Sequence, residues 1–248
     1  MADAPIPAAT LVLFRERDGA PPELLMIERA RAMAFAGGAM VFPGGRIDPG
    51  DHTLAASLSG GEDAAARVAA IRETIEEVGV AIGVVPPPSP EQLTAIRAQL
   101  HAGEPFALAL AAAGLTLDLT TLVPFARWLP DHPGIRIFDT RFFLARAPDD
   151  SAPVVDATET VRLVWTSAAA MLVAADAGDA TIIYPTRRNL ERLARFAGFD
   201  DAVADAVAHP VRTITPHLET RAGVPHLCIP DDLGYPITAE PMMAVRRG

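Results

Sequence analysis

A short acidic stretch holds the side chains with the clearest potential for chemistry. Glu73, Glu76 and Glu77 fall within five consecutive positions, directly after Arg72. At about 100° per residue, the apolar residues around them share one face of a helix, and the glutamates lie on roughly the opposite face. The residues of the apolar face are Val68, Ile71, Ile75 and Val78. The spacing therefore predicts a helix over about 62–78 with one strongly acidic face.

An acidic helix face has two ordinary explanations. Like charges three or four residues apart repel one another and destabilise a helix by about 0.2–0.5 kcal/mol per pair. Such a face is therefore either solvated surface or a place that holds a cation. Carboxylate oxygens are the ligands that Mg²⁺ prefers, and a glutamate can also accept a proton as a general base. By themselves, the three glutamates favour the solvated surface.

A glycine-rich loop upstream reverses that preference. In Phe42-Pro43-Gly44-Gly45 the glycines let the backbone approach another group closely. Together with the acidic stretch, the loop resembles the Nudix box, whose pattern is Gly, five residues, Glu, seven residues, then Arg-Glu-apolar-x-Glu-Glu-x-Gly-apolar. Asp51 stands where the family usually has Glu, and Thr74 stands at a usually apolar position. The residues that match the pattern are Gly45, Arg72, Glu73, Glu76, Glu77, Gly79 and Val80.

The box is longer here than in the family pattern. Asp51 and Arg72 are separated by 20 residues where the pattern has seven, which corresponds to an insertion of 13 at about 52–64. The chain is thereby similar to a Nudix subgroup that accepts insertions here and includes a peroxisomal acyl-coenzyme A diphosphatase of animals. Other segments that resemble this subgroup are Leu122–Trp128, Phe138–Leu144, and Glu159 followed by Trp165.

A second element resembles the part of such enzymes that is associated with coenzyme A. It runs from Leu25 to Ala30 and continues through Gly38 to Gly45. It departs from that element at Ile27, where the element has Thr, and at Ala34, where it has Arg. Taken together, the resemblance covers about residues 8–170.

The resemblance implies a set of catalytic and metal-binding residues. Glu73, Glu76 and Glu77 would hold one or more Mg²⁺ or Mn²⁺ ions, which would neutralise a diphosphate and promote attack by water. One of these glutamates, or Glu159, would act as the base. Arg72 would orient the glutamates by ion pairing, with Asp51 as a candidate partner.

Arginines and glycines near the box are candidates for binding the substrate phosphates. They are Arg29, Arg31 and Arg46, together with Gly44 and Gly45. Simpler alternatives stay open: Arg29 and Arg31 could pair with surface carboxylates, and Glu159 could be a surface loop residue. Trp128 and Trp165 are expected in the core rather than as stacking platforms.

Composition narrows the function classes. The chain has 248 residues and a net charge of −10, which argues against a broad nucleic-acid-binding surface. It contains no lysine, so a lysine nucleophile or P-loop lysine is excluded, and its one cysteine argues against a cysteine-based zinc site. Neither an apolar run of about 18 residues nor a secretory signal is visible. We expect a cytoplasmic protein that does not bind membranes.

The predicted elements indicate a mixed fold. Strands are expected at 8–14, 23–29, 120–129, 136–145 and 161–166, and helices at 62–78, from Pro90, and at 105–113, 167–177, 186–197 and 200–208. Predicted helix caps are Ser59 with Glu62, Ser89 with Gln92, and Thr186, and predicted stops are Gly79, Gly114 and Gly198. The last 40 residues are rich in proline and are expected to form an irregular arm.

Strands, a helix, more strands and then helices predict an α+β fold, in which a Nudix-like mixed sheet lies between helices as an α/β/α sandwich with additional C-terminal helices. We expect one domain, 1–248, with a core at about 8–170. Its appendages would be the insertion at 52–64, a helical insertion at 89–114, and C-terminal helices with an arm at 171–248. The arm is a candidate contact in a homodimer.

These features predict a metal-dependent Nudix hydrolase. Its substrate would be a nucleoside diphosphate derivative, with coenzyme A or acyl-coenzyme A preferred. The alternatives are ADP-ribose, NADH or another nucleotide diphosphate. A different class, a non-catalytic nucleotide-binding module, also remains open, although such modules usually lose a box glutamate and this sequence keeps all three.

Overall fold

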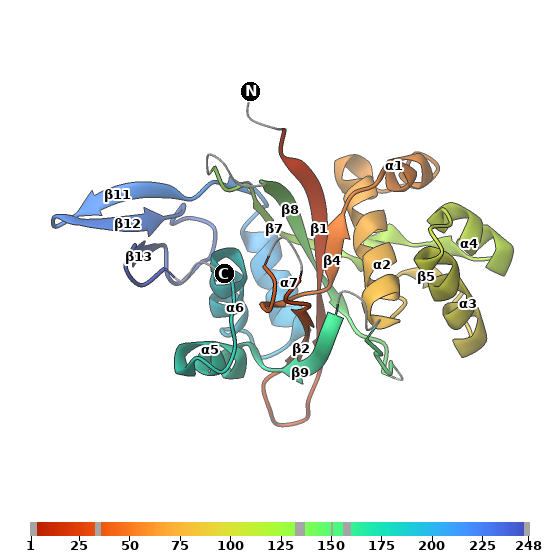
Figure 1. The fold of residues 1–248 in the computed structure, drawn as a ribbon, viewed down its shortest axis with the longest axis horizontal. Helices are drawn as coiled ribbons and strands as arrows, with labels where there is room; N and C mark the ends of the chain where they lie inside the picture. The colour runs from red at the N-terminus through yellow and green to blue at the C-terminus, as the bar shows by residue number, and fades with distance from the viewer. Residues whose placement is uncertain (1–3, 33–35, 132–136, 150, 156–159, 246–248) are drawn as a thin grey trace.

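A mixed β-sheet forms the centre of the fold (Figure 1). The computed structural model describes residues 4–32, 36–131, 137–149, 151–155 and 160–245. Within these residues the main sheet has eight strands in the order β10-β7-β8-β1-β2-β3, with β4 paired to β1 and β9 to β2. Their bounds are β1 Ile6–Arg15, β2 Glu23–Arg29, β3 Met40–Val41, β4 Gly44–Arg46, β7 Val123–Trp128, β8 Phe138–Arg146, β9 Thr160–Thr166 and β10 Thr213–Ile214.

The sheet is mixed, as predicted, because β1 runs parallel to β8 but antiparallel to β2 and β4. Alternate residues of β1 point to opposite faces of the sheet. Leu11 and Leu13 pack into one apolar core, and Val12 and Phe14 pack into another. The strand is therefore covered on both sides.

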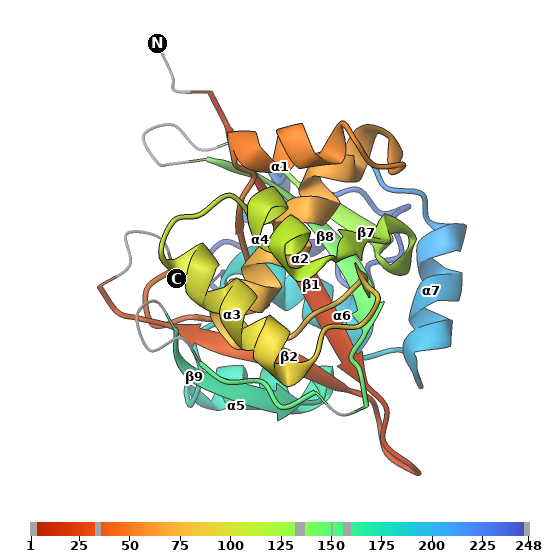
Figure 2. The same cartoon turned by 90° about the vertical axis from the view of Figure 1, so that its right-hand side faces the viewer.

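Helices cover both faces of this sheet, which confirms the predicted sandwich. One layer contains α1 Pro49–Ala55, α2 Ala64–Val78, α3 Pro90–His101 and α4 Phe106–Ala113 (Figure 2). The other contains α5 Ala168–Ala177, α6 Tyr184–Leu193 and α7 Phe199–Ala208. Short 3-10 turns at Gly61–Asp63 and Leu119–Thr121 and a small pair of strands, β5 Val84–Val85 and β6 Thr116–Leu117, complete the first layer. No helix among the described residues is long and apolar enough to cross a membrane.

The ends of the helices test the predicted caps. Gly79 ends α2 in the left-handed conformation, with φ 66°, and Gly114 ends α4 in the same way, as predicted. Ser89 and Gln92 form the predicted capping box of α3. The cap at Ser59 and Glu62 was wrong, because Gly61–Asp63 forms a 3-10 turn and α2 begins only after it.

The C-terminal elements differ more from the prediction. Helix α6 starts two residues before Thr186, after Ile183 at the N-cap, and ends at Leu193 rather than near Gly198. The irregular arm was also wrong in part. Beyond β10, a three-stranded sheet forms from β11 His217–Arg221, β12 Val224–Cys228 and β13 Ala239–Pro241.

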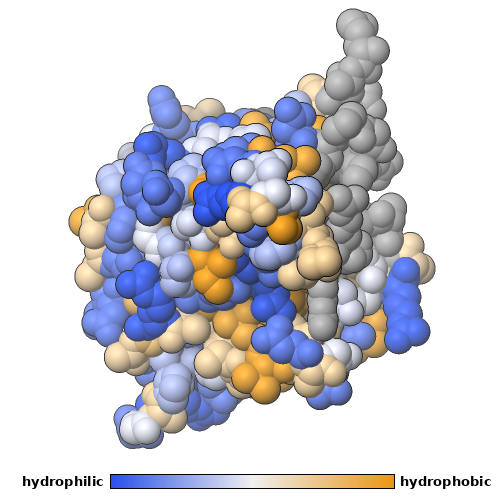
Figure 3. Space-filling view, turned by 90° about the vertical axis from the view of Figure 1, so that its left-hand side faces the viewer, coloured by the Kyte–Doolittle hydropathy of each residue, from blue (hydrophilic) through white to orange (hydrophobic). Residues whose placement is uncertain are grey.

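The small sheet extends away from the main sheet (Figure 1). Its hairpin turns at Ala222 and Gly223, whose φ angles of 48° and 80° are both positive, as a two-residue hairpin turn of type I′ requires. The side of the molecule that carries it mixes hydrophilic and hydrophobic residues (Figure 3).

Candidate active site

Helix α2 places the acidic stretch between the sheet and the outer helices. Its predicted apolar face is fully buried in the core beneath β1. The opposite face is not solvated surface, since the Glu77 residue is only 5% exposed. The side chains of Glu73 and Glu76 are 16% and 30% exposed. Three carboxylates are therefore held in a largely enclosed place.

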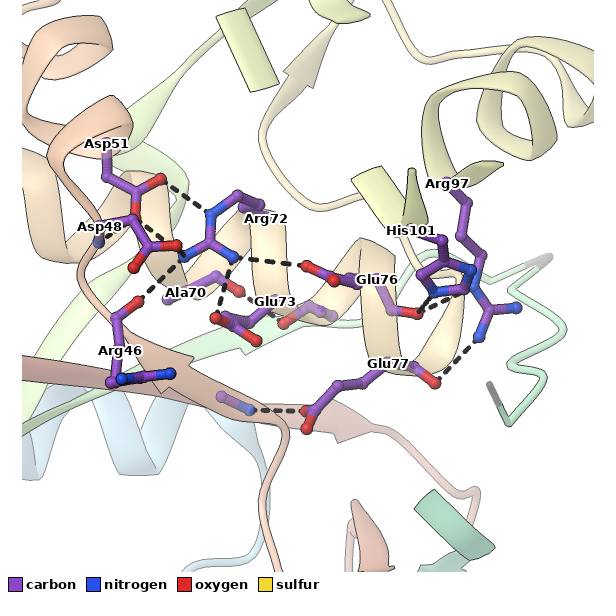
Figure 4. A network of polar contacts seen from close by, with 12 residues as sticks. Arg46, Asp48, Asp51, Ala70, Arg72, Glu73, Glu76, Glu77, Arg97 and His101 are labelled. Carbon is purple, nitrogen blue, oxygen red and sulfur yellow. Dashed lines mark hydrogen bonds and ion pairs between the residues drawn. The ribbon is translucent and has the colours of Figure 1, made fainter. Parts of the chain in front are cut away.

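Arg72 lies at the centre of this acidic group (Figure 4). Its Nε and Nη2 atoms donate to the two carboxylate oxygens of Asp51, each at 2.9 Å. Its Nη1 donates to Glu73 at 2.9 Å and to Glu76 at 3.4 Å. Nη2 also donates to the carbonyl oxygen of Arg46 at 2.9 Å. One guanidinium thus joins α1, α2 and β4.

The glycines of β4 allow the strand to lie directly against α2. The Gly44 N–H donates to the Glu77 carboxylate at 2.9 Å. A Cβ on Gly45 would overlap the carboxylate of Glu73, and a Cβ on Gly44 would lie 2.7 Å from Thr10 Cα on β1. Gly44 therefore needs to be glycine because a Cβ would overlap the backbone of β1, whereas a Cβ at Gly45 would require the Glu73 side chain to move.

Burial changes the acid–base properties of the site. It raises the pKa of Glu73 to about 7; Arg72 opposes this shift, and the charges of Glu76 and Asp51 add to it. Burial alone would lower the pKa of Arg72, but its hydrogen bonds with Asp51 and the neighbouring carboxylates raise it above the usual value. Arg72 accordingly stays charged.

The donor set fits a divalent cation. Four carboxylates, those of Asp48, Asp51, Glu73 and Glu76, lie within 4 Å of the Arg72 guanidinium, and one positive charge does not balance them. Among the described residues no three metal-ligating side chains already converge on one point. Glu73 and Glu76 turn toward Arg72 while Glu77 bonds to β4, so coordination would require a rearrangement of these side chains.

A cavity of about 860 Å³ opens beside this group. The cavity is lined by the three glutamates together with Arg29, Arg46, Gly44 and Gly45. The structure thus brings these predicted site residues together. Buried Arg29 Nε has no hydrogen-bond partner among the described residues. Arg31 is exposed and does not line the cavity.

The predicted base Glu159 lies outside the residues that the structure describes. None of the residues 52–64, all of which are described, lines the cavity. The segment instead completes α1 and leads into α2, and Asp63 pairs with Arg141 of β8 at 2.8 Å.

The helical insertion contributes residues that sequence reasoning missed. Arg97 of α3 donates to the carbonyl oxygens of Glu76 and Glu77 at 2.9 and 3.0 Å, which satisfies the C-terminal end of α2. A His101 ring nitrogen lies 3.1 Å from the Glu76 carbonyl, and both His101 and Glu104 line the cavity. The sequence offered one signal for this contact: Arg97 is a basic residue long enough to reach a helix end. Local spacing does not show which helix end it reaches.

Similarities to known proteins agree with this geometry. The NUDIX domain model matches residues 4–106. A crystal structure of a NUDIX hydrolase from Alicyclobacillus acidocaldarius is 30% identical, with a TM-score of 0.72, over 82% of this chain and 97% of that chain. No curated protein sequence matches.

Two more distant structures are also similar. The MutT protein from Methanosarcina mazei Go1 is 15% identical, with a TM-score of 0.45, over 79% of this chain and 96% of that one. The NUDIX domain of Shewanella oneidensis NrtR, solved with ADP ribose, is 15% identical, with a TM-score of 0.44, over 76% and 86%.

Proposed function

Because this chain belongs to the Nudix hydrolase family, we propose that it hydrolyses the diphosphate bond of a nucleoside diphosphate derivative with the help of Mg²⁺ or Mn²⁺. The observation that carries the proposal is the acidic group around Arg72, which faces a cavity that also contains Arg29 and Arg46. The carboxylates can hold a cation, and the arginines can bind phosphate oxygens.

Each group of residues would have its own role in the reaction. A bound divalent ion would supply positive charge to the diphosphate oxygens and make water a better nucleophile. Glu73, Glu76 and Glu77 would hold it, while Arg72 and the Gly44 N–H fix the directions of these side chains. One oxygen–phosphorus bond forms from water as another breaks, and a glutamate of this group takes the proton. The products are two phosphate monoesters.

Within this class we favour coenzyme A or acyl-coenzyme A as the substrate. Cleavage would give adenosine 3′,5′-bisphosphate and a phosphopantetheine. The support is the resemblance of the stretch from Leu25 to Gly45, which here forms β2, β3 and β4 beside the cavity. ADP-ribose and NADH are the alternatives.

A substrate panel tests the proposal. Purified protein is incubated with coenzyme A, octanoyl-coenzyme A, ADP-ribose or NADH, with Mg²⁺, Mn²⁺ or a chelator, and the products are separated by chromatography. We expect hydrolysis only with metal, and adenosine 3′,5′-bisphosphate from the coenzyme A substrates. Glu76→Gln and Glu77→Gln should each lower the rate by ~100-fold or more. Glu62→Gln, at an exposed position outside the acidic group, is the matched control.

Metal binding can be followed without turnover. Ligands that bind only the folded state raise the melting temperature. Mn²⁺ should therefore stabilise the wild type and Glu62→Gln, and should stabilise Glu76→Gln and Glu77→Gln less. Tight nucleotide binding without hydrolysis of any substrate would contradict the proposal and favour a non-catalytic module.

A further inference from the structure

The lining of the cavity has an uncharged part, which the later half of the chain contributes. Among the described residues, every acidic or basic side chain that lines the cavity comes from the stretch between Arg29 and Glu104. All lining residues from Trp128 onward are uncharged, and most are apolar. They include Trp128, Phe138, Phe142, Ile183, Pro185 and Thr186.

The uncharged part is built by two strands and one helix. Phe138 and Phe142 lie on the same face of β8, and Trp128 ends the neighbouring strand β7, opposite Thr140. Ile183 and Pro185 stand at the start of α6 and face the same space. These residues all follow the segment 4–106 that matches the NUDIX domain model.

Polar contacts behind the wall hold Trp128 in place. Its indole N–H is shared between the Asn189 side-chain oxygen at 3.4 Å and the Tyr235 hydroxyl at 3.3 Å. The Tyr235 hydroxyl donates to the same Asn189 oxygen at 2.7 Å. The rings of Tyr184 and Tyr235 pack edge-on against Trp128, with centroids 6.0 and 5.8 Å away. The wall is therefore positioned by α6 and by the C-terminal segment.

We propose that the uncharged part is a specificity subsite for an apolar substituent, such as an acyl chain, on the diphosphate substrate. This subsite depends on the proposed function, because the diphosphate must lie at the arginines and glutamates for a substituent to reach this wall. The side chains of this part supply no counter-ion of their own to a charged group, which would lose water there, whereas an apolar group gains contacts. A volume of about 860 Å³ is large enough for both parts of such a substrate.

Substitutions at Ile183 test the subsite without disturbing the fold. Ile183 is the N-cap of α6, where both Asp and Ser are favourable residues. Ile183→Asp therefore adds a charge to the wall, and Ile183→Ser provides a matched uncharged control. Val173→Asp adds the same charge to α5 at a position that is 69% exposed. Thermal unfolding checks that each variant folds.

The readout is kcat/KM for octanoyl-coenzyme A and for ADP-ribose, which lacks an acyl chain. We expect the wild type to prefer octanoyl-coenzyme A, and Ile183→Asp to lose ~10–100-fold on it, mainly through KM. Ile183→Ser should lose less activity on octanoyl-coenzyme A than Ile183→Asp does. The kcat/KM of Ile183→Asp for ADP-ribose, and that of Val173→Asp for either substrate, should stay within about threefold of the wild-type value.

The outcomes separate the subsite from the proposed function. Equal losses on both substrates, or no loss on octanoyl-coenzyme A, would overturn the subsite while metal-dependent hydrolysis by the wild type still stands. Hydrolysis of no diphosphate at all would overturn the proposed function and, with it, the subsite.

Discussion

Asp51 and Arg72 form a bidentate ion pair although 20 residues separate them in the chain. Asp51 is 1% exposed, and its second role is to accept a hydrogen bond from the Asp48 N–H at the start of α1. The pair fixes the guanidinium, which leaves Nη1 directed toward Glu73 and Glu76. The position of the acidic group therefore depends on a carboxylate outside α2.

Asp51→Asn should destabilise the protein. Removing one charge of a buried pair leaves the other poorly compensated, which typically costs 3–5 kcal/mol. Because Arg72 keeps Glu73 and Glu76 as neighbours, we expect a loss of about 2–4 kcal/mol in the free energy of unfolding, measured in urea. Asp48→Asn is the control: its carboxylate is 3.7 Å away and 60% exposed, so less than about 0.5 kcal/mol should be lost. Similar losses in the two variants would show that burial of the pair is unimportant.

Gly45→Ala should impair catalysis through Glu73. The added methyl group would occupy the place of the Glu73 carboxylate, which must then move away from Arg72. We expect kcat on the best substrate of the panel to fall by ~10-fold or more, since positioning errors of about 1 Å cost up to 10²-fold. Gly50→Ala also lies at the cavity, but open space surrounds its Cβ position, so its kcat should stay near that of the wild type. A normal kcat in Gly45→Ala would show that catalysis does not depend on the contact between Gly45 and the Glu73 carboxylate.

Tyr235→Phe should weaken the attachment of the C-terminal segment to the sheet. The substitution removes the buried hydroxyl that bonds Asn189 and accepts from Trp128. The expected loss in the free energy of unfolding is about 1–2 kcal/mol. Tyr184→Phe removes a longer hydrogen bond, 3.3 Å to the Leu227 carbonyl, at a partly exposed site and should cost less. The ordering of the two variants in urea unfolding is the test, and the reverse ordering would refute it.

Glu191 should make stability depend on pH. Burial raises its pKa from 4.5 to about 7, although Arg188 and Arg187 oppose the shift. The folded state therefore holds a proton that the unfolded state releases between about pH 4.5 and 7. Its contribution to stability is complete below pH 4.5 and is lost as the pH rises through 7. The expected fall in the free energy of unfolding is about 1–3 kcal/mol.

Urea unfolding near pH 5 and pH 8 measures this effect. Glu191→Gln cannot ionise and should reduce the difference between the two pH values, leaving the part that Glu73 contributes through its own raised pKa. Asp149→Asn, at an exposed position, should leave the difference as in the wild type. An unchanged pH dependence in Glu191→Gln would mean that another group is responsible.

Local patterns in the sequence predicted the elements that carry the chemistry. The apolar spacing around Glu73 predicted α2. Gly79 predicted its C-terminal end, where the structure has this glycine in the left-handed conformation. Thr74, at a usually apolar position, caused no error because its hydroxyl donates to the Ala70 carbonyl at 2.7 Å within the same helix. A buried polar group that is satisfied locally leaves the periodic pattern intact.

Contacts between distant parts of the chain could not be predicted in the same way. Nothing near Arg97 indicates that it caps α2, and nothing near Ile183 indicates that it faces the cavity. The prediction of Trp128 as a core residue was confirmed, yet the residue also lines the cavity. These assignments depend on how separate elements pack, which periodicity does not encode.

The pairing of β1 with β8 has a consequence for how the protein is made. Ile6 pairs with Phe138, 132 positions later, and the pairing continues to Phe14 with Arg146. At roughly 5–20 residues per second, the ribosome needs about 7–26 s to deliver that partner after β1 has been synthesised. For that interval the edge of β1 that later pairs with β8 has backbone N–H and C=O groups without their strand partner, and such an edge can pair with another chain. The yield of folded protein should thus depend on translation speed and on the chaperones present during synthesis.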